Sequence, residues 1–389
     1  MASVQKILIV GGGIAGMVAA VALHQKDFDV EIVEVNPKWD VYGVGIIQLA
    51  NTMRALATVG LANQVLAAGF GMDKVSFYDH DGNLISEIPQ PRLAGPHYPA
   101  ANALTRPRLH KILQDAVREA GVNVRVGVTV SELVQMDDAV EVTFTDWTTG
   151  RYDLVIGADG IRSLIRSLVF GTSYQPGFAG QMCWRYNVPR PPEVDNFQMF
   201  LGPSGNKAGF VPLAPDLMYI FLTETPREPG NPWPRIREQQ LAEVFGEERL
   251  AEAFRERLME FGGPVARIRD NDITDASKVV YWPFETILVP PPWYRGRVVL
   301  IGDAAHAMTA HIAQGAAMAI EDAVVLADEL ATKPALLKAL DGYMERRYER
   351  CKSLVEISME LCRGEINNDR TVDVPGLTAR SIQIAAAPI

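Results

Sequence analysis

The chain has few cysteines, no long apolar run and no tract of basic residues, and each absence excludes a class of protein. Its 389 residues include only Cys183, Cys351 and Cys362, which form no CxxC pair. A disulfide framework is therefore not expected, and isolated thiols suit a reducing cytoplasm. No apolar stretch reaches the roughly 20 residues that span a bilayer. Lys6 and a glycine-rich turn interrupt the first apolar run, so no signal peptide is expected.

Basic residues are also fewer than acidic ones. The chain carries 37 Lys and Arg against 47 Asp and Glu, which gives a formal net charge of −10. A chain of this sign is repelled by nucleic acids and by anionic membranes, so neither is expected as a partner. The six histidines show no metal-like spacing, and no metal site is expected. The length is enough for about two domains.

The chain does have a glycine-rich motif between a strand and a helix near its N-terminus. An apolar strand, Lys6–Val10, runs into Gly11-Gly12-Gly13-Ile14-Ala15-Gly16 and an apolar helical run, and a second strand near residue 30 ends at Glu34. In a Gly-x-Gly-x-x-Gly turn, Gly11 permits the tight turn, Gly13 lets the backbone approach a pyrophosphate, and Gly16 lets the helix pack on the strand. The helix N-terminus attracts phosphates, and Glu34 can accept hydrogen bonds from ribose hydroxyls. The unit predicts a site for FAD or NAD rather than NADP.

Two more glycine–acid pairs follow predicted strands. Asp159-Gly160 comes after the strand 153–156, and Gly302-Asp303 comes after the strand 297–301. Carboxylates at the C-terminal ends of such strands face the crevice where ligands bind. Each pair alone is also an ordinary turn sequence. Their order behind the first motif favours one nucleotide domain that a second domain interrupts.

The texture of the sequence changes between about residues 178 and 284, where aromatic residues and prolines are frequent and apolar residues alternate. We expect strands at 182–188, 197–201, 209–213 and 218–222, and a charged helix at 238–260. Elsewhere we expect a turn at 43–46, a strand at 74–80, and helices at 51–61, 108–119 and 336–365. The predicted fold class is α/β, a Rossmann-like dinucleotide domain with an inserted α+β domain on a mixed or antiparallel sheet. The expected limits are 1–72, 98–176 and 285–372 for the first domain, 73–97 and 177–284 for the second, and a loosely ordered tail at 373–389.

Together the three motifs resemble those of the single-component FAD-dependent aromatic hydroxylases, the p-hydroxybenzoate hydroxylase-like class A flavoprotein monooxygenases. The resemblance extends from Lys6 to about Cys351, and it includes Gly43-Val44-Gly45-Ile46, Arg106-Pro107-Arg108, Trp184-Arg185 and Gln314-Gly315. It implies FAD as the cofactor. The FAD-binding residues that it implies are Gly11, Gly13, Ile14, Ala15, Gly16, Glu34, Gly45, Arg106, Val130, Asp159, Arg166, Asp303, Gly315, Ala316 and Ala317.

The resemblance also implies a reaction. NADH or NADPH reduces the flavin, dioxygen forms a flavin C4a-hydroperoxide, and one oxygen passes to an activated aromatic ring of the hydroxypyridine or hydroxybenzoate kind. No second Gly-x-Gly-x-x-Gly marks a separate NAD(P)H domain. Such chemistry needs a proton relay and a dry site. The chain is expected to act as a monomer or a homodimer.

The positions of several residues relative to these motifs make them candidates for catalysis. His311 lies in the loop expected over the flavin and is the candidate base, with a structural role as the open alternative. Tyr186 and Tyr219 are candidates for lining the substrate, although each can be a packing residue. Gln48 follows the Gly43–Ile46 turn and is a candidate ring contact. His306 is expected to have a structural role. Arg185 either faces an anionic substrate or supports the fold.

The sequence departs from the family at a few positions. Relatives usually have proline where this chain has Ala307 and Ala310, and alanine predicts a more mobile loop there. Val35 stands where relatives often have arginine. Three other functions stay open at this point: a flavin monooxygenase of a polycyclic natural product, an amine or amino-acid oxidase that needs no NAD(P)H, and a flavin-binding scaffold. A flavin halogenase is disfavoured because no Trp-x-Trp-x-Ile-Pro segment is present.

Overall fold

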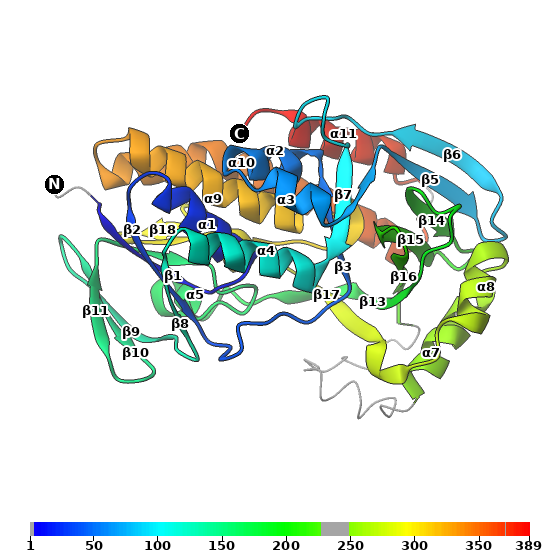
Figure 1. The fold of residues 1–389 in the computed structure, drawn as a ribbon, viewed down its shortest axis with the longest axis horizontal. Coiled ribbons are helices and arrows are strands. Elements are labelled where there is room, and N and C mark those ends of the chain that lie inside the picture. Colours follow the sequence, from blue (N-terminus) through cyan, green and yellow to red (C-terminus); the bar gives the residue numbers. More distant parts are fainter. Residues whose placement is uncertain (1–3, 227–248, 370) are drawn as a thin grey trace.

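The computed structural model describes residues 4–226, 249–369 and 371–389, and its strands form two main sheets (Figure 1). The first sheet has six strands in the order β18-β19-β12-β1-β2-β8. Its central strands are parallel, and β1, β12 and β19 are almost wholly apolar, as expected for a sheet covered on both faces. The bounds are β1 (Lys6–Val10), β2 (Asp29–Glu34), β8 (Asn123–Val126), β12 (Leu154–Gly157), β18 (Tyr294–Arg295) and β19 (Val298–Leu300).

Helices and a small sheet surround these strands. Helix α9 packs against α1, α2 and α10. The parallel strands β1, β12 and β19 all lead into loops at one edge of the sheet. The helices are α1 (Ile14–His24), α2 (Ala50–Thr58), α3 (Ala62–Ala67), α4 (Arg106–Glu119), α5 (Leu164–Phe170), α9 (Gly315–Thr332) and α10 (Leu336–Ile366). The small sheet is β11-β10-β9, built from β9 (Val130–Gln135), β10 (Val140–Phe144) and β11 (Thr149–Tyr152).

The second main sheet has eight strands in the order β20-β17-β13-β16-β15-β14-β5-β6. It is mixed, because β14 pairs parallel with β5 while its other pairs are antiparallel. The bounds are β5 (Lys74–Asp79), β6 (Leu84–Pro89), β13 (Gly177–Pro189), β14 (Phe197–Leu201), β15 (Lys207–Ala214), β16 (Leu217–Glu224), β17 (Val280–Leu288) and β20 (His306–Ala307). The predicted fold class is confirmed, while the exact domain limits stay a prediction.

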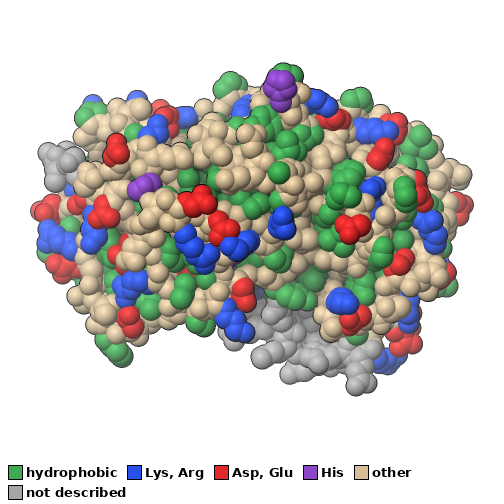
Figure 2. Space-filling model, viewed as in Figure 1, with side chains coloured by type: hydrophobic (Ala, Val, Ile, Leu, Met, Phe, Trp, Pro, Cys, Tyr) green, Lys and Arg blue, Asp and Glu red, His purple; other side chains and the backbone are tan. Residues whose placement is uncertain are grey.

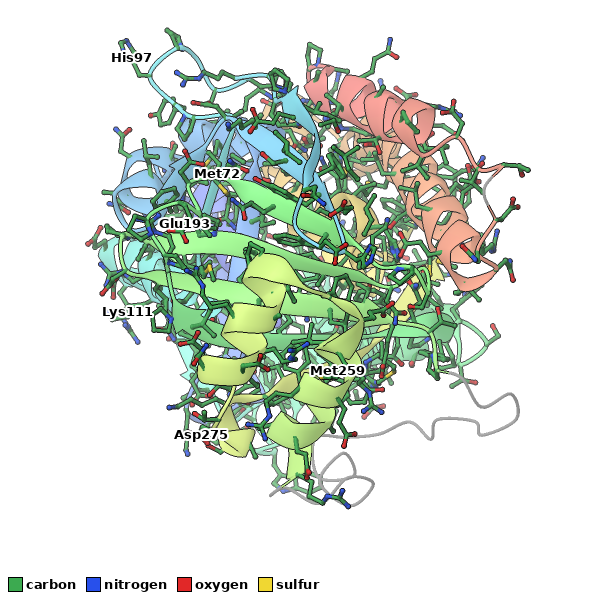
Figure 3. The ribbon with its side chains drawn as sticks, turned by 90° about the vertical axis from the view of Figure 1, so that its right-hand side faces the viewer. Met72, His97, Lys111, Glu193, Met259 and Asp275 are labelled. Carbon is green, nitrogen blue, oxygen red and sulfur yellow. The ribbon has the colours of Figure 1, made fainter. Side chains whose placement is uncertain are left out.

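The two faces of this sheet have different neighbours. Figure 3 shows α7 (Leu250–Arg257) and α8 (Gly263–Asn271) lying across one face, near the labelled Met259. The short helices η2 (Leu258–Glu260) and η3 (Ala276–Lys278) complete that layer. The other face packs against the sheet β3-β7-β4, which consists of β3 (Gly45–Leu49), β7 (Ala101–Thr105) and β4 (Phe70–Met72). Alternate residues of each strand therefore point toward different parts of the molecule.

The structure corrects several expected elements. The expected tail contains helix α11 (Val374–Ala386), whose last carbonyls accept hydrogen bonds from Arg54 and Arg350. Distant arginines that satisfy a helix end leave no local signal in the sequence. The expected turn at 43–46 already belongs to β3 from Gly45 onward. Residues 227–248 lie outside the described part, so only the end of the helix expected at 238–260 is seen, as α7 and η2.

The surface agrees with the composition. Figure 2 shows one face of the molecule, on which acidic and basic side chains are intermixed rather than gathered by sign. Within the described residues, no helix combines the length and the apolar character that crossing a bilayer requires. All three cysteines are buried free thiols.

Candidate active site

The three glycine motifs meet in space. A Cβ on Gly11 would come within 2.4 Å of the Ala158 carbonyl oxygen, so the first loop touches the second. A Cβ on Gly302 would come within 3.2 Å of the Ala15 Cβ, so the third loop touches the first helix. Both glycines have positive φ, +109° and +59°, which other residues rarely adopt. The motifs that the sequence separates by well over a hundred residues thus form one edge of the six-stranded sheet.

The geometry of the first loop fits a pyrophosphate. Gly16 lies so close to the preceding turn that its Cβ would be 2.0 Å from the Gly11 carbonyl oxygen, which explains the close packing of α1 on β1. By contrast, a Cβ on Gly13 would meet no atom within 4 Å. Gly13 precedes α1 in extended conformation, beside the free N–H groups of Ile14 and Ala15. Open space in front of a helix N-terminus is what a phosphate group needs.

Glu34 stands at the end of β2, next to this loop. Its carboxylate accepts hydrogen bonds from the backbone N–H groups of Gly12 and Asn36, both at 2.7 Å. The indole of Trp39 donates to the Gly12 carbonyl at 2.8 Å and further fixes the loop. The Glu34 carbonyl accepts from the Val128 N–H at 3.1 Å, which brings the segment that leads to Val130 beside the same strand. Glu34 and Val130 therefore flank the glycine loop, where the adenosine end of a dinucleotide would lie.

Arg106 and Asp303 lie where the two main sheets meet. The charge of Asp303, which follows β19, and the groups of Arg185 and Tyr219 on the eight-stranded sheet all act on the pKa of Arg106. Arg106 and Asp303 are both exposed to solvent. Yet burial is the largest influence on each pKa: it raises the pKa of the Asp303 carboxyl and lowers that of the Arg106 guanidinium. Side chains that water reaches and that much protein nevertheless surrounds lie in a recess of the surface, and this recess is called the cleft below. After burial, the charge of Arg185 lowers the pKa of Arg106 further, whereas the charge of Asp303 opposes it.

Tyr219 and Arg185 face this cleft from the eight-stranded sheet. Tyr219 on β16 is 7% exposed, and its ring lies against Gly45 of β3. Burial raises its pKa to about 12, although the charges of Arg185 and Arg106 act in the opposite direction. Neither the Tyr219 hydroxyl nor the Arg185 guanidinium has a hydrogen-bond or ion-pair partner among the described residues. The cleft therefore offers one neutral hydroxyl and two cations to a ligand.

Tyr186 is not part of this arrangement. It lies on β13 opposite Ile220 of β16, and its ring packs in the apolar cluster beneath α7 and α8. Its hydroxyl accepts the Asp275 N–H at 3.2 Å. Because side chains alternate along a strand, Tyr186 and Tyr219 occupy opposite faces of the sheet. Sequence position alone did not distinguish the two faces.

Gln48 is buried on the core-facing side of β3. It shares a face of β3 with Ile46, which belongs to the core of the six-stranded sheet, and it is 0% exposed. Neither its amide nitrogen nor its amide oxygen has a hydrogen-bond partner in the described structure. The neighbouring Asn102 on β7 and Thr52 on α2 also contribute unpaired oxygens. This buried polar group is enclosed, whereas Arg106 and Asp303 are open to the cleft.

Asp159 and Arg166 support the loops around the cleft. The Asp159 carboxylate accepts from the Ser163 hydroxyl at 2.5 Å and from two N–H groups at the start of α5, so it caps that helix. Arg166 is 1% exposed and donates to three backbone carbonyls, including that of Ala304 at 2.9 Å. Ala304 follows Asp303. Both side chains are therefore engaged in holding the second and third motifs together.

A buried hydrogen-bond network fixes the start of α9, where Gly315, Ala316 and Ala317 lie. Asn51 donates to Gln314, the residue before the helix, at 2.9 Å and to Glu321 at 3.0 Å. Glu321 in turn accepts from Arg347 at 2.6 Å and from Arg350 at 2.8 Å. The N–H groups of this helix start are thereby held at the cleft.

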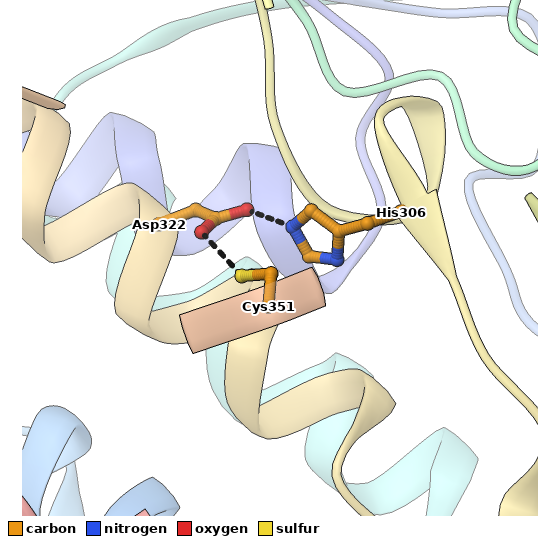
Figure 4. A group of neighbouring side chains, drawn as sticks. All are labelled: His306, Asp322 and Cys351. Atoms are coloured by element: carbon orange, nitrogen blue, oxygen red, sulfur yellow. Dashed lines mark hydrogen bonds and ion pairs between the residues drawn. The ribbon is translucent and has the colours of Figure 1, made fainter. Parts of the chain in front are cut away.

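The same network includes His306, Asp322 and Cys351, whose ligand-type atoms lie within 4.8 Å of one another (Figure 4). Asp322 accepts from the His306 ring at 2.6 Å, from the Gly302 N–H at 2.8 Å and from Arg347 at 2.8 Å. The Arg347 guanidinium already supplies the positive charge that a metal ion would bring. This cluster consequently anchors the Gly302-Asp303 loop, and His306 has the structural role that the sequence suggested.

His311 is 4% exposed at its side chain and has chain partners at both ring nitrogens. Nδ1 lies 2.9 Å from the Thr309 hydroxyl. Nε2 lies 2.9 Å from the Gln181 amide oxygen and 3.3 Å from the Glu365 carboxylate. Sequence reasoning identified the histidine but none of these partners, because Gln181 and Glu365 come from strands and helices more than fifty residues away.

Comparisons with known proteins agree with this geometry. Residues 4–358 match the family described as the FAD binding domain. The chain is 33% identical to 2-heptyl-3-hydroxy-4(1H)-quinolone synthase of Pseudomonas aeruginosa, over 82% of this chain and 79% of that protein. It is 30% identical to 6-hydroxynicotinate 3-monooxygenase of Pseudomonas fluorescens, over 84% and 83%. The structure of Klebsiella pneumoniae HpxO complexed with FAD and uric acid superposes with a TM-score of 0.81 at 24% identity, covering 98% of this chain and 92% of that one. The chain belongs to the FAD binding domain family, and it is an FAD-dependent aromatic monooxygenase.

Proposed function

We propose that this monooxygenase hydroxylates a small aromatic ring that carries an ionisable hydroxyl or carboxylate, of the hydroxypyridine or hydroxybenzoate kind, with NADH or NADPH as reductant. The observation that carries the proposal is Arg185, which has no hydrogen-bond or ion-pair partner among the described residues and faces the cleft together with Arg106 and Tyr219. Partly enclosed guanidinium groups bind planar anions well, because their fork of N–H donors matches a carboxylate or an enolate. The curated relatives named above act on nitrogen heteroaromatic rings according to their names, which supports the same class.

The cofactor would lie along the edge where the three motifs meet. Gly11, Gly13, Gly16 and the N–H groups of Ile14 and Ala15 would hold the pyrophosphate, and Glu34 would hold the adenosine ribose beside Val130. Asp303 would bind the ribityl side, while the start of α9, residues 315–317, would face the ring. Gly45 and Arg106 would close the other side. Asp159 and Arg166 would act through the loops that they support.

The residues of the cleft then have definable tasks. FAD, when bound, supplies hydride acceptance and oxygen activation. Arg185 would hold the substrate anion and favour the deprotonated, electron-rich ring. Tyr219 stays a neutral hydrogen-bond donor, because burial raises its pKa to about 12. FAD and substrate, when bound, would displace water from the cleft, which would protect the oxygen-transfer step.

The test measures NADH and NADPH oxidation by FAD-loaded protein with a panel of hydroxypyridines, hydroxybenzoates and hydroxyquinolines, each with and without a carboxylate. Product mass and peroxide are followed together. We expect an anionic ring to stimulate oxidation by at least about tenfold and to gain one oxygen atom with little peroxide. The variant Arg185→Met should raise KM for that ring. Arg190→Met should not, because Arg190 lies just past the end of the same strand and is engaged with backbone carbonyls. Flavin reduction by an amine without NAD(P)H would instead indicate an oxidase.

A further inference from the structure

We propose that His311 is a positioning residue that carries a proton on both ring nitrogens and, through Glu365, latches the loop 309–314 to the second domain. It would thereby hold the start of α9 in place and would not act as a base. The inference concerns the same site as the proposed function, and only its effect on coupling rests on that function.

The hydrogen-bond pattern around Thr309 indicates where the protons are. The Ser358 hydroxyl donates to the Thr309 carbonyl at 2.8 Å. The Thr309 hydroxyl lies 2.6 Å from the Ser358 hydroxyl oxygen and 3.2 Å from the Ser358 carbonyl. With the Ser358 proton committed to the carbonyl, the Thr309 proton points to Ser358, and its oxygen is left to accept from His311. Only a protonated Nδ1 can donate that hydrogen bond.

The other nitrogen faces acceptors alone. The Gln181 amide oxygen and the Glu365 carboxylate both lie within hydrogen-bond distance of Nε2. Nε2 must therefore carry a proton as well. In the alternative, a bare Nδ1 accepts from Thr309. Either the Thr309 carbonyl then loses its Ser358 donor in a buried place, or the two hydroxyl oxygens lie 2.6 Å apart with no proton between them. Satisfying all four groups requires the doubly protonated ring.

The charges around the ring agree with this arrangement. Burial alone raises the pKa of the Glu365 carboxyl, but the hydrogen bond with His311 and the charge of Lys207 outweigh it and lower the pKa to about 2. Lys207 on β15 forms an ion pair with the same carboxylate. Two other titratable groups lie close. The Cys362 thiol contacts Gln181 and is neutral because burial raises its pKa to about 12, and Arg363 next to it is exposed.

The latch joins three parts of the molecule. His311 and Thr309 belong to the loop around η5 (Ala310–Ile312) that leads directly into α9. Glu365 and Ser358 lie on α10, while Gln181 and Lys207 lie on β13 and β15 of the eight-stranded sheet. The loop needs such a restraint, since Ala313 has a φ of 52° that disfavours non-glycine residues. Without the ion pair, the loop would lose one of its two restraints, and the hydrogen bond between Asn51 and Gln314 alone would hold the start of α9.

The direct test is a long-range ¹H–¹⁵N spectrum of the ¹⁵N-labelled FAD-loaded enzyme, in which His311→Gln identifies the His311 signals among six histidines. We expect both ring nitrogens of His311 to be protonated at pH 7.5 in the wild type and one to be unprotonated in Glu365→Gln. The control Glu360→Gln, an exposed carboxylate on the same helix, should leave the signals unchanged. A neutral His311 in the wild type at pH 7.5 would overturn the inference.

A second readout follows the loop itself. Hydrogen exchange in residues 309–317 should become at least about tenfold faster in Glu365→Gln but not in Glu360→Gln, and peroxide should rise relative to hydroxylated product. Should Glu365→Gln not fold, Thr309→Val removes the Nδ1 acceptor and must convert the ring to the singly protonated form. If no aromatic substrate is found, the spectra and the exchange rates still decide the latch. Unchanged hydrogen exchange in both Glu365→Gln and Thr309→Val would contradict the latch.

Discussion

Gly45 and Tyr219 lie in direct contact across the boundary between the two sheets. A Cβ on Gly45 would come within 2.4 Å of two ring carbons of Tyr219 and within 2.6 Å of the Leu213 side chain. The family-like Gly-x-Gly-Ile segment is thus explained in part by packing. The absence of a side chain at Gly45 lets β3 approach the floor of the cleft and brings the Tyr219 hydroxyl within reach of the space beside Arg106.

Gly45→Ala should therefore destabilise the protein itself. The added methyl overlaps a ring on one side and a leucine on the other, and neither can move without disturbing the core between the sheets. Overpacking of this kind costs about 1–3 kcal/mol. Urea unfolding of the FAD-free protein measures the cost. A midpoint equal to that of the wild type would show that the sheets adjust freely.

Gly13→Ala should have the opposite profile. A methyl group here points into open space, and the backbone of Gly13, with φ −80°, suits any residue. Stability without FAD should stay within about 0.5 kcal/mol of the wild type. FAD affinity, measured by fluorescence titration, should fall by about tenfold or more, because the methyl occupies the space that the pyrophosphate needs. Unchanged affinity would mean that the pyrophosphate does not approach this residue.

Spacing made this part of the site predictable. Glycine–acid motifs at strand ends are local signals, and the C-terminal ends of parallel strands meet by topology. The convergence of Gly11, Glu34 and Asp303 at one edge of the sheet could therefore be predicted without coordinates. The partners of His311 could not. Glu365 lies in the middle of a charged helical pattern, and nothing local distinguishes it from Glu360, which is exposed. Which acid of a helix meets a given histidine depends on how distant elements pack.

The two tyrosines provide a matched test of the assignment of faces. Tyr219→Phe removes from the cleft a hydroxyl that has no partner in the described part of the chain. It should lower kcat/KM by about tenfold to a hundredfold, with little change in stability. Tyr186→Phe removes the acceptor of the Asp275 N–H under α7 and should cost about 1 kcal/mol of stability while leaving kcat/KM unchanged. Steady-state kinetics and thermal melts on both variants suffice. Equal kinetic effects would show that the cleft does not lie on the Tyr219 face.

Asp322 should make the stability of the protein depend on acid pH. Burial would raise its pKa, but His306 and Arg347 lower the pKa from its ordinary value of 3.8 to about 2. The folded state then binds the proton more weakly than the unfolded state. Its contribution is complete above the ordinary pKa and is lost as the pH falls from about 4 toward 2. A shift of this size corresponds to about 2 kcal/mol.

Asp322→Asn tests this contribution against a surface control. The variant leaves Arg347 and His306 short of a buried counter-charge, so it should lose about 3–5 kcal/mol at pH 7 and show a flatter decline between pH 4 and 2 than the wild type. Asp328→Asn removes a partly exposed partner of Arg346 and should cost less than about 1 kcal/mol with no change in slope. Because Asp322 also accepts the Gly302 N–H, weaker FAD binding should accompany the loss in Asp322→Asn alone. If both variants unfold at the same urea concentration, the network does not stabilise the Gly302-Asp303 loop.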